Sequence, residues 1–274
     1  MFFMRKILVY LSPLLCLLLL VLALVISRRE AVMRQTASPS PGRLRLICDA
    51  QLQDPVQAML EAFQRRHYVQ VEMVVATPGQ LLSEGRGRLD GDILLTLERV
   101  PEVSLGVDAG SHGSPVELAT LRPVVLASSA SAGQFREWSD LTRLGLRLAL
   151  PGRRDSALAR HTAVLLAVGG LGWEAAVGQA VFQSDDGAML ARAVALGKAD
   201  AAVLWEPNAR LYSQLAAVVL LPVDDNDLAV VCMAALASGV ERPEQLLLKR
   251  FLRGALAAEI FLEYSYGLPA ASRH

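Results

Sequence analysis

The sequence predicts an α/β protein whose parallel sheets are covered by helices, behind an N-terminal hydrophobic segment. The first observation is that strand-like and helix-like stretches alternate from residue 43 onward, which is typical of parallel sheets with helical connections. The second is a run of 20 uncharged residues close to the N-terminus. The third is size, because about 235 residues follow that segment, enough for one large domain or two medium lobes.

Composition excludes several classes of protein. The chain carries 27 basic and 27 acidic residues and no long run of either sign. We therefore expect no nucleic-acid partner, because phosphate binding needs a surplus of Lys and Arg on one face. The sequence contains no CxxC, HExxH or paired Cys/His spacing, so we expect neither a metal site nor a cofactor.

The three cysteines favour free thiols over a disulfide. Cys16 lies inside the hydrophobic segment, which leaves Cys48 and Cys232 as the one possible intrachain pair. Both lie in strand-like apolar runs, ICDA and VVCMAAL. Buried free thiols are the ordinary state of cysteines in such runs, and the disulfide remains the alternative.

The N-terminus has the length of a membrane-spanning helix. Arg5-Lys6 precedes the uncharged run Ile7–Ile26. At about 1.5 Å per residue, a helix of this length spans roughly 30 Å, the hydrocarbon thickness of a bilayer. The apolar core of a signal peptide is usually shorter, so we expect residues 1–29 to form an uncleaved anchor. A signal peptide cleaved near Ser27 is the main alternative, and a lipid anchor is a minor one.

A Ser/Pro-rich linker connects this segment to the folded part. Residues 30–42 include TASPSPG and show no apolar periodicity, as expected of a linker. A first strand is predicted at Leu44–Cys48. The helix after it is predicted to start at an Asp54 cap, with Pro55 at the first helical position and Gln57 closing a capping box.

The remaining elements follow from hydrophobic periodicity and from Gly and Pro breaks. Further strands are expected at Val69–Val75, Asp92–Leu97, Pro123–Ser128, Leu146–Leu150, Ala201–Trp205, Val218–Val223 and Leu228–Met233. Further helices are expected at Gln80–Ser83, Ser156–Val168, Ala188–Leu196, Pro243–Leu256 and Ala257–Tyr264. We find no convincing internal repeat. Since ligands bind beyond the carboxyl ends of such strands, the loops Asp49–Gln53 and Ala76–Gln80 are candidate functional segments.

Three segments resemble a known family in their order and spacing. They are LRLICDAQLQDPVQAMLEAFQRRH (Leu44–His67), ALGKADAAVLWEPNA (Ala195–Ala209) and AEIFLEYSYGLP (Ala258–Pro269). Together with the intervening ATPGQL and LALPG, they resemble the periplasmic molybdate-binding proteins, a family of type II extracellular solute-binding proteins that serve ABC transporters. The resemblance is spread over about 230 residues, and its strength comes from the order of the motifs rather than from any one of them.

The resemblance implies a two-lobed, type II periplasmic-binding-protein-like fold, with mixed sheets flanked by helices, that closes on a small ligand. One lobe would consist of residues 43–122 plus 225–274, and the other of residues 123–224. Closure would expel water, so that fixed dipoles act in a lower dielectric. By the same resemblance, Asp92 and Asp200 are structural residues at turns or strand ends.

The resemblance also implies the ligand site. The first ligand serine of the family falls on Gln51, and the second falls on Pro78, between Thr77 and Gly79. Because neither position keeps a hydroxyl, a larger, neutral or cationic organic solute is an alternative to a molybdate-like oxyanion. The backbone donors that the family has at helix starts fall on Ser156 and near Gly187. Its ligand tyrosine falls on Trp205, and Glu206 stands beside that residue. The expected ligand-binding residues are thus Gln51, Thr77, Gly79, Ser156, Gly187, Trp205 and Glu206.

The expected function is that of an extracytoplasmic solute-binding protein of an ABC-type importer. It would be a monomer that meets an ABC permease, either anchored by a single membrane pass or secreted, on the periplasmic or extracellular face of the cell membrane. The alternative is a membrane-anchored sensor or interaction module on the same fold that has lost ligand transport. We expect no catalytic residues, since Ser111 and His112 in GSHGS do not form a nucleophile motif.

Overall fold

The computed structural model describes residues 43–76, 91–98, 115–142, 145–152, 156–236 and 241–269. These residues fall within one compact unit, Leu44–His274, except for Arg43 at its edge. In the described part, no helix is long and apolar enough to span a bilayer. The predicted anchor (1–29), the linker (30–42) and the predicted helix Gln80–Ser83 lie outside the described residues.

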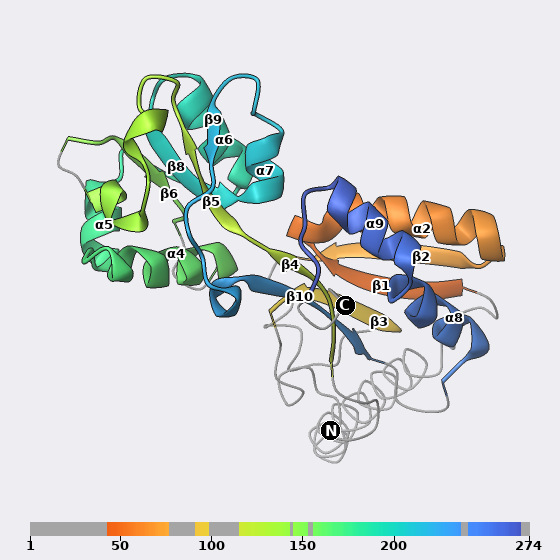
Figure 1. The fold of residues 1–274 in the computed structure, drawn as a ribbon. Coiled ribbons are helices and arrows are strands. Elements are labelled where there is room, and N and C mark those ends of the chain that lie inside the picture. Colours follow the sequence, from red (N-terminus) through yellow and green to blue (C-terminus); the bar gives the residue numbers. More distant parts are fainter. Residues whose placement is uncertain are drawn as a thin grey trace, which may run out of the picture. The chain divides into compact units, whose positions relative to one another are not determined.

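Two mixed five-stranded sheets form the framework of the described residues (Figure 1). The first has the order β2-β1-β3-β10-β4, with β2 Gln70–Ala76, β1 Arg43–Asp49, β3 Ile93–Leu97, β10 Ala229–Ala235 and β4 Val116–Leu121. The second has the order β7-β6-β8-β5-β9, with β7 Phe182–Gln183, β6 Leu148–Leu150, β8 Ala201–Trp205, β5 Pro123–Ala127 and β9 Ala217–Val219.

The two sheets share one topology. In the first, β1 is parallel to the central strand β3, and β10 is antiparallel to it. In the second, β6 is parallel to the central strand β8, and β5 is antiparallel to it. Arg122 alone separates β4 of the first sheet from β5 of the second. The α/β fold class with mixed sheets is therefore confirmed, and the structure contains a repeat that the sequence analysis missed.

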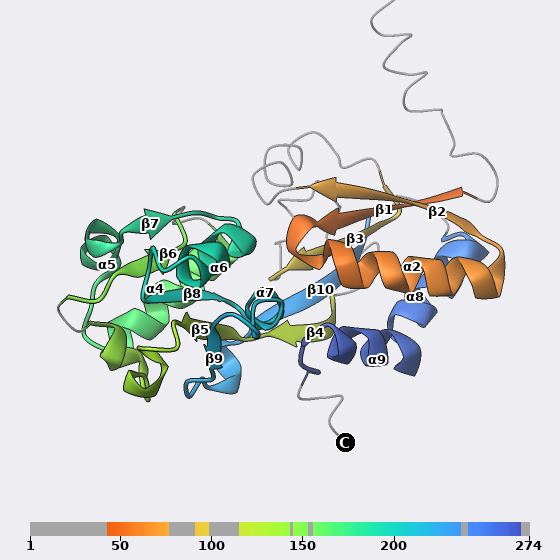
Figure 2. The same cartoon turned by 90° about the horizontal axis from the view of Figure 1, so that it is seen from above.

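Three helices pack together on one face of the first sheet, as Figures 1 and 2 show. They are α2 Gln53–His67, α8 Pro243–Leu252 and α9 Ala255–Glu263. Helix α2 buries Val56, Met59, Leu60 and Phe63, the face that its i, i+3, i+4, i+7 spacing predicts. The Phe63 ring meets Phe251 of α8 edge-on, with ring centroids 5.4 Å apart.

Helices cover both faces of the second sheet. Alternate residues of a strand point to opposite faces. In β5, Val124 and Leu126 join the cluster that includes α6 (Gly187–Ala195), whereas Val125 and Ala127 join the one that includes Leu165 and Leu166 of α4 (Ala157–Val168). Two short helices complete this half of the structure: α5 Trp173–Gln179 contacts α4, and α7 Glu206–Arg210 contacts α6. The near-continuous apolar runs of β5 and β8 thus follow from burial on both sides.

One aspartate clamps the start of each central strand to its parallel neighbour. Asp92 precedes β3, accepts the N–H of Arg45 at 2.8 Å and donates its own N–H to the Arg45 carbonyl at 2.8 Å. Asp200 precedes β8 and makes the same pair with Arg147, at 2.9 and 2.7 Å. Both lie at strand ends and make these backbone contacts, as the structural role implied for them requires.

Each clamp also holds a third segment. The carbonyl of Asp92 accepts the N–H of Leu236, which follows β10, at 3.0 Å, and that of Asp200 accepts the N–H of Ser128, which follows β5, at 2.8 Å. The Asp92 carboxylate pairs in addition with Arg242 at the start of α8. Each aspartate thus makes hydrogen bonds to the backbone of the strands on both sides of it. These bonds, at a buried or partly buried position, fix the register of the strands.

The start of α2 differs from its prediction. Asp49 caps a 3-10 turn, η1 (Ala50–Leu52), and α2 begins directly after it at Gln53. Asp54 and Pro55 therefore lie inside the first helical turn rather than at its boundary. The Gln57 side chain donates to Glu61 at 3.0 Å instead of closing a capping box. The prediction failed because a 3-10 turn leads directly into the helix, and the Gln53 N–H donates to the Ala50 carbonyl within that turn.

Several other elements were not predicted. They are β4, β7, α5, α7 and the 3-10 turns η4 Ala132–Gln134, η5 Trp138–Thr142 and η6 Asp225–Asp227. Most are five residues or fewer, too short for a periodic pattern to mark them. The other predicted strands and helices form within a few residues of their expected bounds, although the strand expected at Val218–Val223 is only β9.

Cys48 and Cys232 are buried free thiols. Cys48 lies opposite Leu95 on one side of β3, and Cys232 lies opposite Thr96 on the other. Two strand spacings, roughly 10 Å, separate their Cα atoms, beyond the ~7 Å that a disulfide can bridge. Burial raises the pKa of the Cys48 thiol well above its ordinary value. The preference for free thiols over a disulfide is confirmed.

We predict opposite effects for two glycine substitutions. A Cβ at Gly169, after α4, would lie 2.7 Å from the backbone Cα of Ser139, so Gly169→Ala should lower the free energy of unfolding by about 1–3 kcal/mol. Gly178 in α5 has open space around it, and Gly178→Ala should be neutral or stabilise by up to ~1 kcal/mol. Urea unfolding of both variants measures the difference, and equal effects would contradict the close approach at Gly169.

Candidate functional site

The candidate site lies at the carboxyl edges of the two sheets. The parallel strands β1 and β3 end at Asp49 and Leu97, and the parallel strands β6 and β8 end at Leu150 and Trp205. In sheets of this kind the loops beyond the carboxyl ends bind ligands. The described residues that the sequence analysis expected in a ligand site end a strand, follow one, or lie at the start of a helix.

A glutamate follows each central strand at an equivalent position. Glu98 directly follows β3, and its N–H donates to the Val230 carbonyl at 2.7 Å. Glu206 directly follows β8, and its N–H donates to the Arg122 carbonyl at 3.0 Å. The segments DILLTLE and DAAVLWE thus repeat one pattern, an aspartate clamp at one end of the strand and a glutamate at the other.

The two glutamates have different partners. Glu206 pairs with Arg210, one turn further along α7, at 2.7 Å. Glu98 instead pairs with Arg160 and, at 3.2 Å, with Nε2 of His161. Both of these partners lie on α4, a helix of the second sheet. The Glu98 carboxylate therefore links the carboxyl edge of the first sheet to a helix that covers the second.

Glu98 has an unusual backbone and a depressed pKa. Its φ of +69° is in the left-handed region, which costs a non-glycine residue of order 1–3 kcal/mol. Thr96 Oγ1 donates to its carbonyl at 3.0 Å and supports this turn. Burial acts to raise the pKa of Glu98, but the hydrogen bonds and positive charges of His161 and Arg160 outweigh burial, and the pKa is lowered.

His161 is fixed by three contacts. Its Nδ1 lies 2.8 Å from the Asp227 carbonyl and its Nε2 lies 3.2 Å from Glu98. Its ring meets Trp205 edge-on, with centroids 5.6 Å apart. Both ring nitrogens thus face acceptor oxygens, and only the doubly protonated imidazolium donates a hydrogen bond from each nitrogen.

Asp49 is a buried carboxylate at the end of β1. Its side chain accepts the N–H of Gln51 at 2.9 Å, and the residue is 2% exposed. Burial, opposed by the Gln51 hydrogen bond and reinforced by the negative charge of Glu98, raises the pKa of Asp49 to about 6. The negative charge of Glu98, beyond the end of β3, thus acts on the carboxyl group at the end of β1.

Gln51 is held by the C-terminal segment. The Tyr266 hydroxyl donates to the Gln51 carbonyl at 2.7 Å. The next residue, Gly267, exchanges two backbone hydrogen bonds of 2.8 Å with Thr120 of β4. The position of the turn after β1 thus depends on the closing Tyr-Gly motif of the chain.

The expected residues of the second sheet lie at helix starts and at the end of β8. Ser156 caps α4, and its hydroxyl accepts the N–H of Ala159 at 3.2 Å. A Cβ at Gly187, the first residue of α6, would lie 2.7 Å from the Asn208 side chain, so this glycine permits the close approach of α6 and α7. Trp205 is 2% exposed and packs in the core beside His161.

The structure brings the expected residues into two groups. In the first, Gln51 hydrogen-bonds to Asp49, Trp205 meets the His161 ring, and Ser156 caps α4, the helix that carries His161. Gly187 and Glu206 belong to the neighbouring contact of α6 with α7. Thr77 and Gly79 lie outside the described residues, as does the GSHGS segment. Among the described residues, no group of His, Cys, Asp or Glu could hold a metal ion.

Sequence reasoning missed Glu98, Arg160 and His161. His161 had no partner pattern in the chain, because its partners are 63 and 66 residues away, at Glu98 and Asp227. One signal was present, the repeated Asp-x5-Glu pattern of DILLTLE and DAAVLWE. An alignment of the two halves on these segments would have placed a glutamate at the carboxyl end of both central strands.

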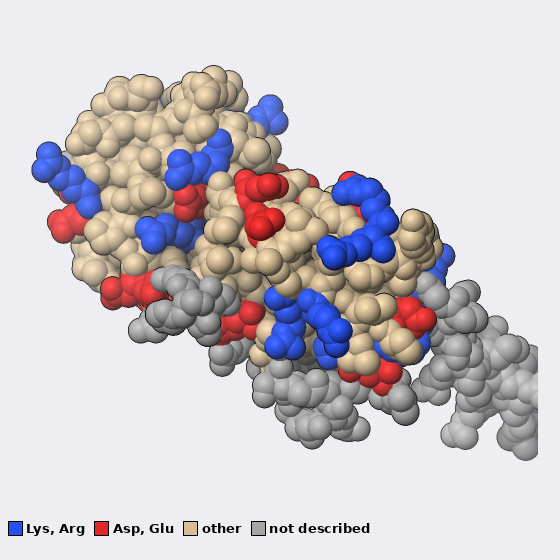
Figure 3. All heavy atoms as spheres, turned by 45° about the vertical axis from the view of Figure 1, so that its right-hand side comes forward, with Lys and Arg blue, Asp and Glu red and all other residues tan. Residues whose placement is uncertain are grey.

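Charged side chains on the visible face form small groups of mixed sign (Figure 3). A protein that binds nucleic acid instead gathers Lys and Arg into a continuous area. The distribution on this face agrees with the balanced composition of the chain.

Comparison with known proteins identifies the family. The model of the bacterial extracellular solute-binding proteins matches residues 44–267. The chain belongs to the bacterial extracellular solute-binding protein family. No curated protein matches the sequence. The family membership agrees with the position of the site at the carboxyl edges of two similar sheets.

Several solved structures share the fold of this solute-binding protein. One is the substrate-binding domain of a molybdenum ABC transporter from Clostridium difficile, at 16% identity and a TM-score of 0.61, covering 82% of this chain and 98% of that one. Another is iron-bound HitA from Pseudomonas aeruginosa, at 15% identity and a TM-score of 0.60, covering 81% and 84%. A third is a two-component system protein that mediates signal transduction, at 15% identity and a TM-score of 0.65, covering 85% and 88%.

At these identities the structural likenesses establish the fold alone, which is that of the type II solute-binding proteins. The resemblance to the molybdate-binding family is therefore confirmed at the level of the solute-binding proteins and of the fold. The ligand is a separate question.

We predict that Asp49 makes stability depend on pH. Because its folded pKa is raised from 3.8 to about 6, the folded state binds this proton more tightly than the unfolded state. The stability that protonation of Asp49 contributes to the folded state is greatest below pH 3.8, decreases as the pH rises through 6 and is absent above it. Asp49→Asn should therefore be more stable than the wild type at pH 8 by up to ~3 kcal/mol, with a smaller difference at pH 4.

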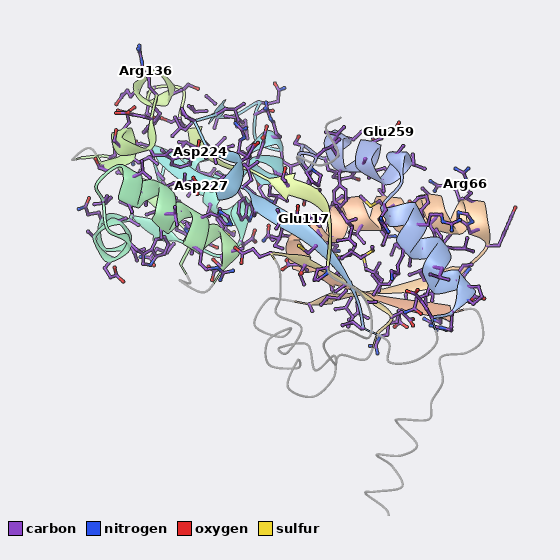
Figure 4. All side chains as sticks on the ribbon, turned by 60° about the horizontal axis from the view of Figure 1, so that its bottom comes forward. Arg66, Glu117, Arg136, Asp224, Asp227 and Glu259 are labelled. Carbon is purple, nitrogen blue, oxygen red and sulfur yellow. The ribbon has the colours of Figure 1, made fainter. Side chains whose placement is uncertain are left out.

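The measurement is urea unfolding at several pH values. Asp224→Asn is the matched control, because Asp224 is exposed and lies away from β1 (Figure 4). If the free energies of unfolding of the wild type and Asp49→Asn differ by the same amount at pH 4 and pH 8, the raised pKa of Asp49 is wrong.

Proposed function

We propose that this protein is the extracytoplasmic solute-binding component of an ABC-type importer. The observation that supports it best is the Glu98 contact with α4, which brings the carboxyl edges of the two sheets together through charged and polar side chains. A receptor of this kind binds its solute between two such edges. Family membership and the likeness to the substrate-binding domain of a molybdenum ABC transporter also support the proposal.

In this proposal the first lobe comprises residues 43–122 plus 225–274, and the second comprises residues 123–224. Backbone groups at the starts of α4 and α6 and the side chains beside the strand ends face the solute. The proposed ligand-binding residues remain Gln51, Thr77, Gly79, Ser156, Gly187, Trp205 and Glu206. The solute is either a molybdate-like oxyanion or an organic molecule, and the receptor acts as a monomer.

The proposed location is the periplasmic or extracellular face of the cell membrane. The hydrophobic segment Ile7–Ile26 would hold the protein there or direct its export. The partner in transport would be an ABC permease. No membrane contact of the folded part is needed for this role.

A sensor on the same fold is the second candidate. One observation favours it: Glu98, Arg160 and His161 already satisfy one another at the candidate site. The likeness to a signal-transduction protein of similar fold agrees with this role. Such a protein would pass a signal to a partner protein rather than a solute to a permease.

We predict that a solute stabilises the folded protein. A ligand at 100 times its dissociation constant adds about 2.7 kcal/mol, which should raise the thermal midpoint by roughly 5–10 °C for a domain of this size. The full chain in detergent is heated with molybdate, tungstate, organic acids, amino acids and diamines in turn. A shift with one class and none with the others supports a receptor.

Trp205→Phe and Trp173→Phe are a matched pair for this experiment. Both tryptophans are buried, at 2% and 8% exposure, but only Trp205 lies at the carboxyl edge, beside His161. We expect the first variant to lose most of the solute-induced shift and the second to keep it. Equal loss in both variants, or no shift with any solute in the wild type, would contradict the receptor and favour the sensor.

A further inference from the structure

Two basic side chains of α4 converge on one carboxylate. Arg160 and His161 lie on the second turn of the helix, and both contact Glu98 from the first sheet. The first turn of α4 contains no acidic residue. Since the N-terminal end of a helix is already positive, cations near it are unfavourable unless an anion faces them. The local charge of α4 is therefore suited to holding an anion.

Of these groups, His161 is the fixed one. Its side chain is 16% exposed, and the Asp227 carbonyl and the Trp205 ring hold it independently of Glu98. If the Glu98 carboxylate moved away, Nε2 of His161 and the Arg160 guanidinium would both lose it as an acceptor. The largely buried Nε2 of His161 is costly to leave without an acceptor, and the Arg160 side chain beside it is 49% exposed, so an anion from solution can take the place of Glu98.

Glu98 is the group that can leave. Its side chain is 28% exposed, and its backbone is held in the left-handed region at φ +69°. Its negative charge also helps to raise the pKa of the buried Asp49. Rotation of Glu98 into solvent would relieve this repulsion between like charges.

We propose that Arg160 and His161 form an anion-recognition site for an organic solute that carries a carboxylate, and that Glu98 occupies this site as an internal competitor when no solute is bound. The inference rests on the proposed receptor function and names its solute class. The guanidinium of Arg160 matches the planar, two-oxygen shape that a solute carboxylate shares with Glu98. A cation would instead have to displace Arg160 from Glu98.

Competition by Glu98 reduces the apparent affinity for the solute. When a site is competent only a fraction of the time, its apparent dissociation constant rises in inverse proportion to that fraction. Glu98→Gln keeps the size of the side chain and removes the competing charge. If Glu98 fills the site about nine-tenths of the time, this substitution should tighten binding about tenfold.

The test is calorimetric titration of the full chain in detergent with acetate, lactate and succinate. We expect Glu98→Gln to bind at least one of these about tenfold more tightly than the wild type, and Arg160→Gln to bind it at least tenfold more weakly. Arg160→Lys keeps the charge and should fall between. Thermal unfolding of each variant checks that it is folded.

Two exposed residues provide matched controls. Glu259→Gln on α9 and Arg66→Gln on α2 make the same charge changes away from the site (Figure 4), and both should bind like the wild type. Weaker or unchanged binding in Glu98→Gln, measured against Glu259→Gln, overturns the competitor role. If a diamine such as putrescine binds and the carboxylates do not, the receptor stands and the anion site is wrong. If no solute binds the wild type or any variant, both the receptor and the anion site are wrong.

Discussion

The paired aspartate clamps are the constraint on which the rest of the structure depends. Asp92 and Asp200 each join the central strand of a sheet to its parallel neighbour, and each carbonyl holds the antiparallel strand on the other side. Parallel strands have no tight turn to set their register, so a side-chain clamp at their start is an effective means of fixing it. Because the register is fixed at the start of β3 and β8, it also determines which residues stand at the carboxyl ends of these strands.

The equivalent glutamates are the consequence of that constraint at the functional edge. Glu98 and Glu206 lie six residues after their aspartates, and each donates its N–H to a carbonyl beside the antiparallel strand. The two glutamates have different partners, since Glu206 pairs within its own helix whereas Glu98 pairs with α4. One symmetrical framework thus carries an asymmetrical site, as expected when function resides in side chains placed on a shared fold.

The sequence predicts the framework better than the site. The α/β class and most strands follow from apolar periodicity, because buried strands such as β5 and β8 are continuous apolar runs. The start of α2 does not follow, because Asp49 caps a 3-10 turn that leads into the helix at Gln53, one residue before the predicted Asp54 cap. The Glu98–His161 contact does not follow either, since it joins residues 63 apart whose approach depends on how two sheets are placed. Of the expected site residues, Trp205 adjoins this contact, and Gln51 hydrogen-bonds to Asp49 at the end of β1.

The return of the chain to the first sheet has a consequence for the order of synthesis. The second sheet uses one continuous segment, from β5 to β9, and all its strands exist once Val219 has been made. The first sheet needs β10, and the turn at Gln51 needs Tyr266. The edge of the first sheet that carries the candidate site therefore depends on residues made after all the strands of the second sheet. The second sheet can thus form while the chain is still being made, whereas this half of the candidate site is completed only after Tyr266 has been made.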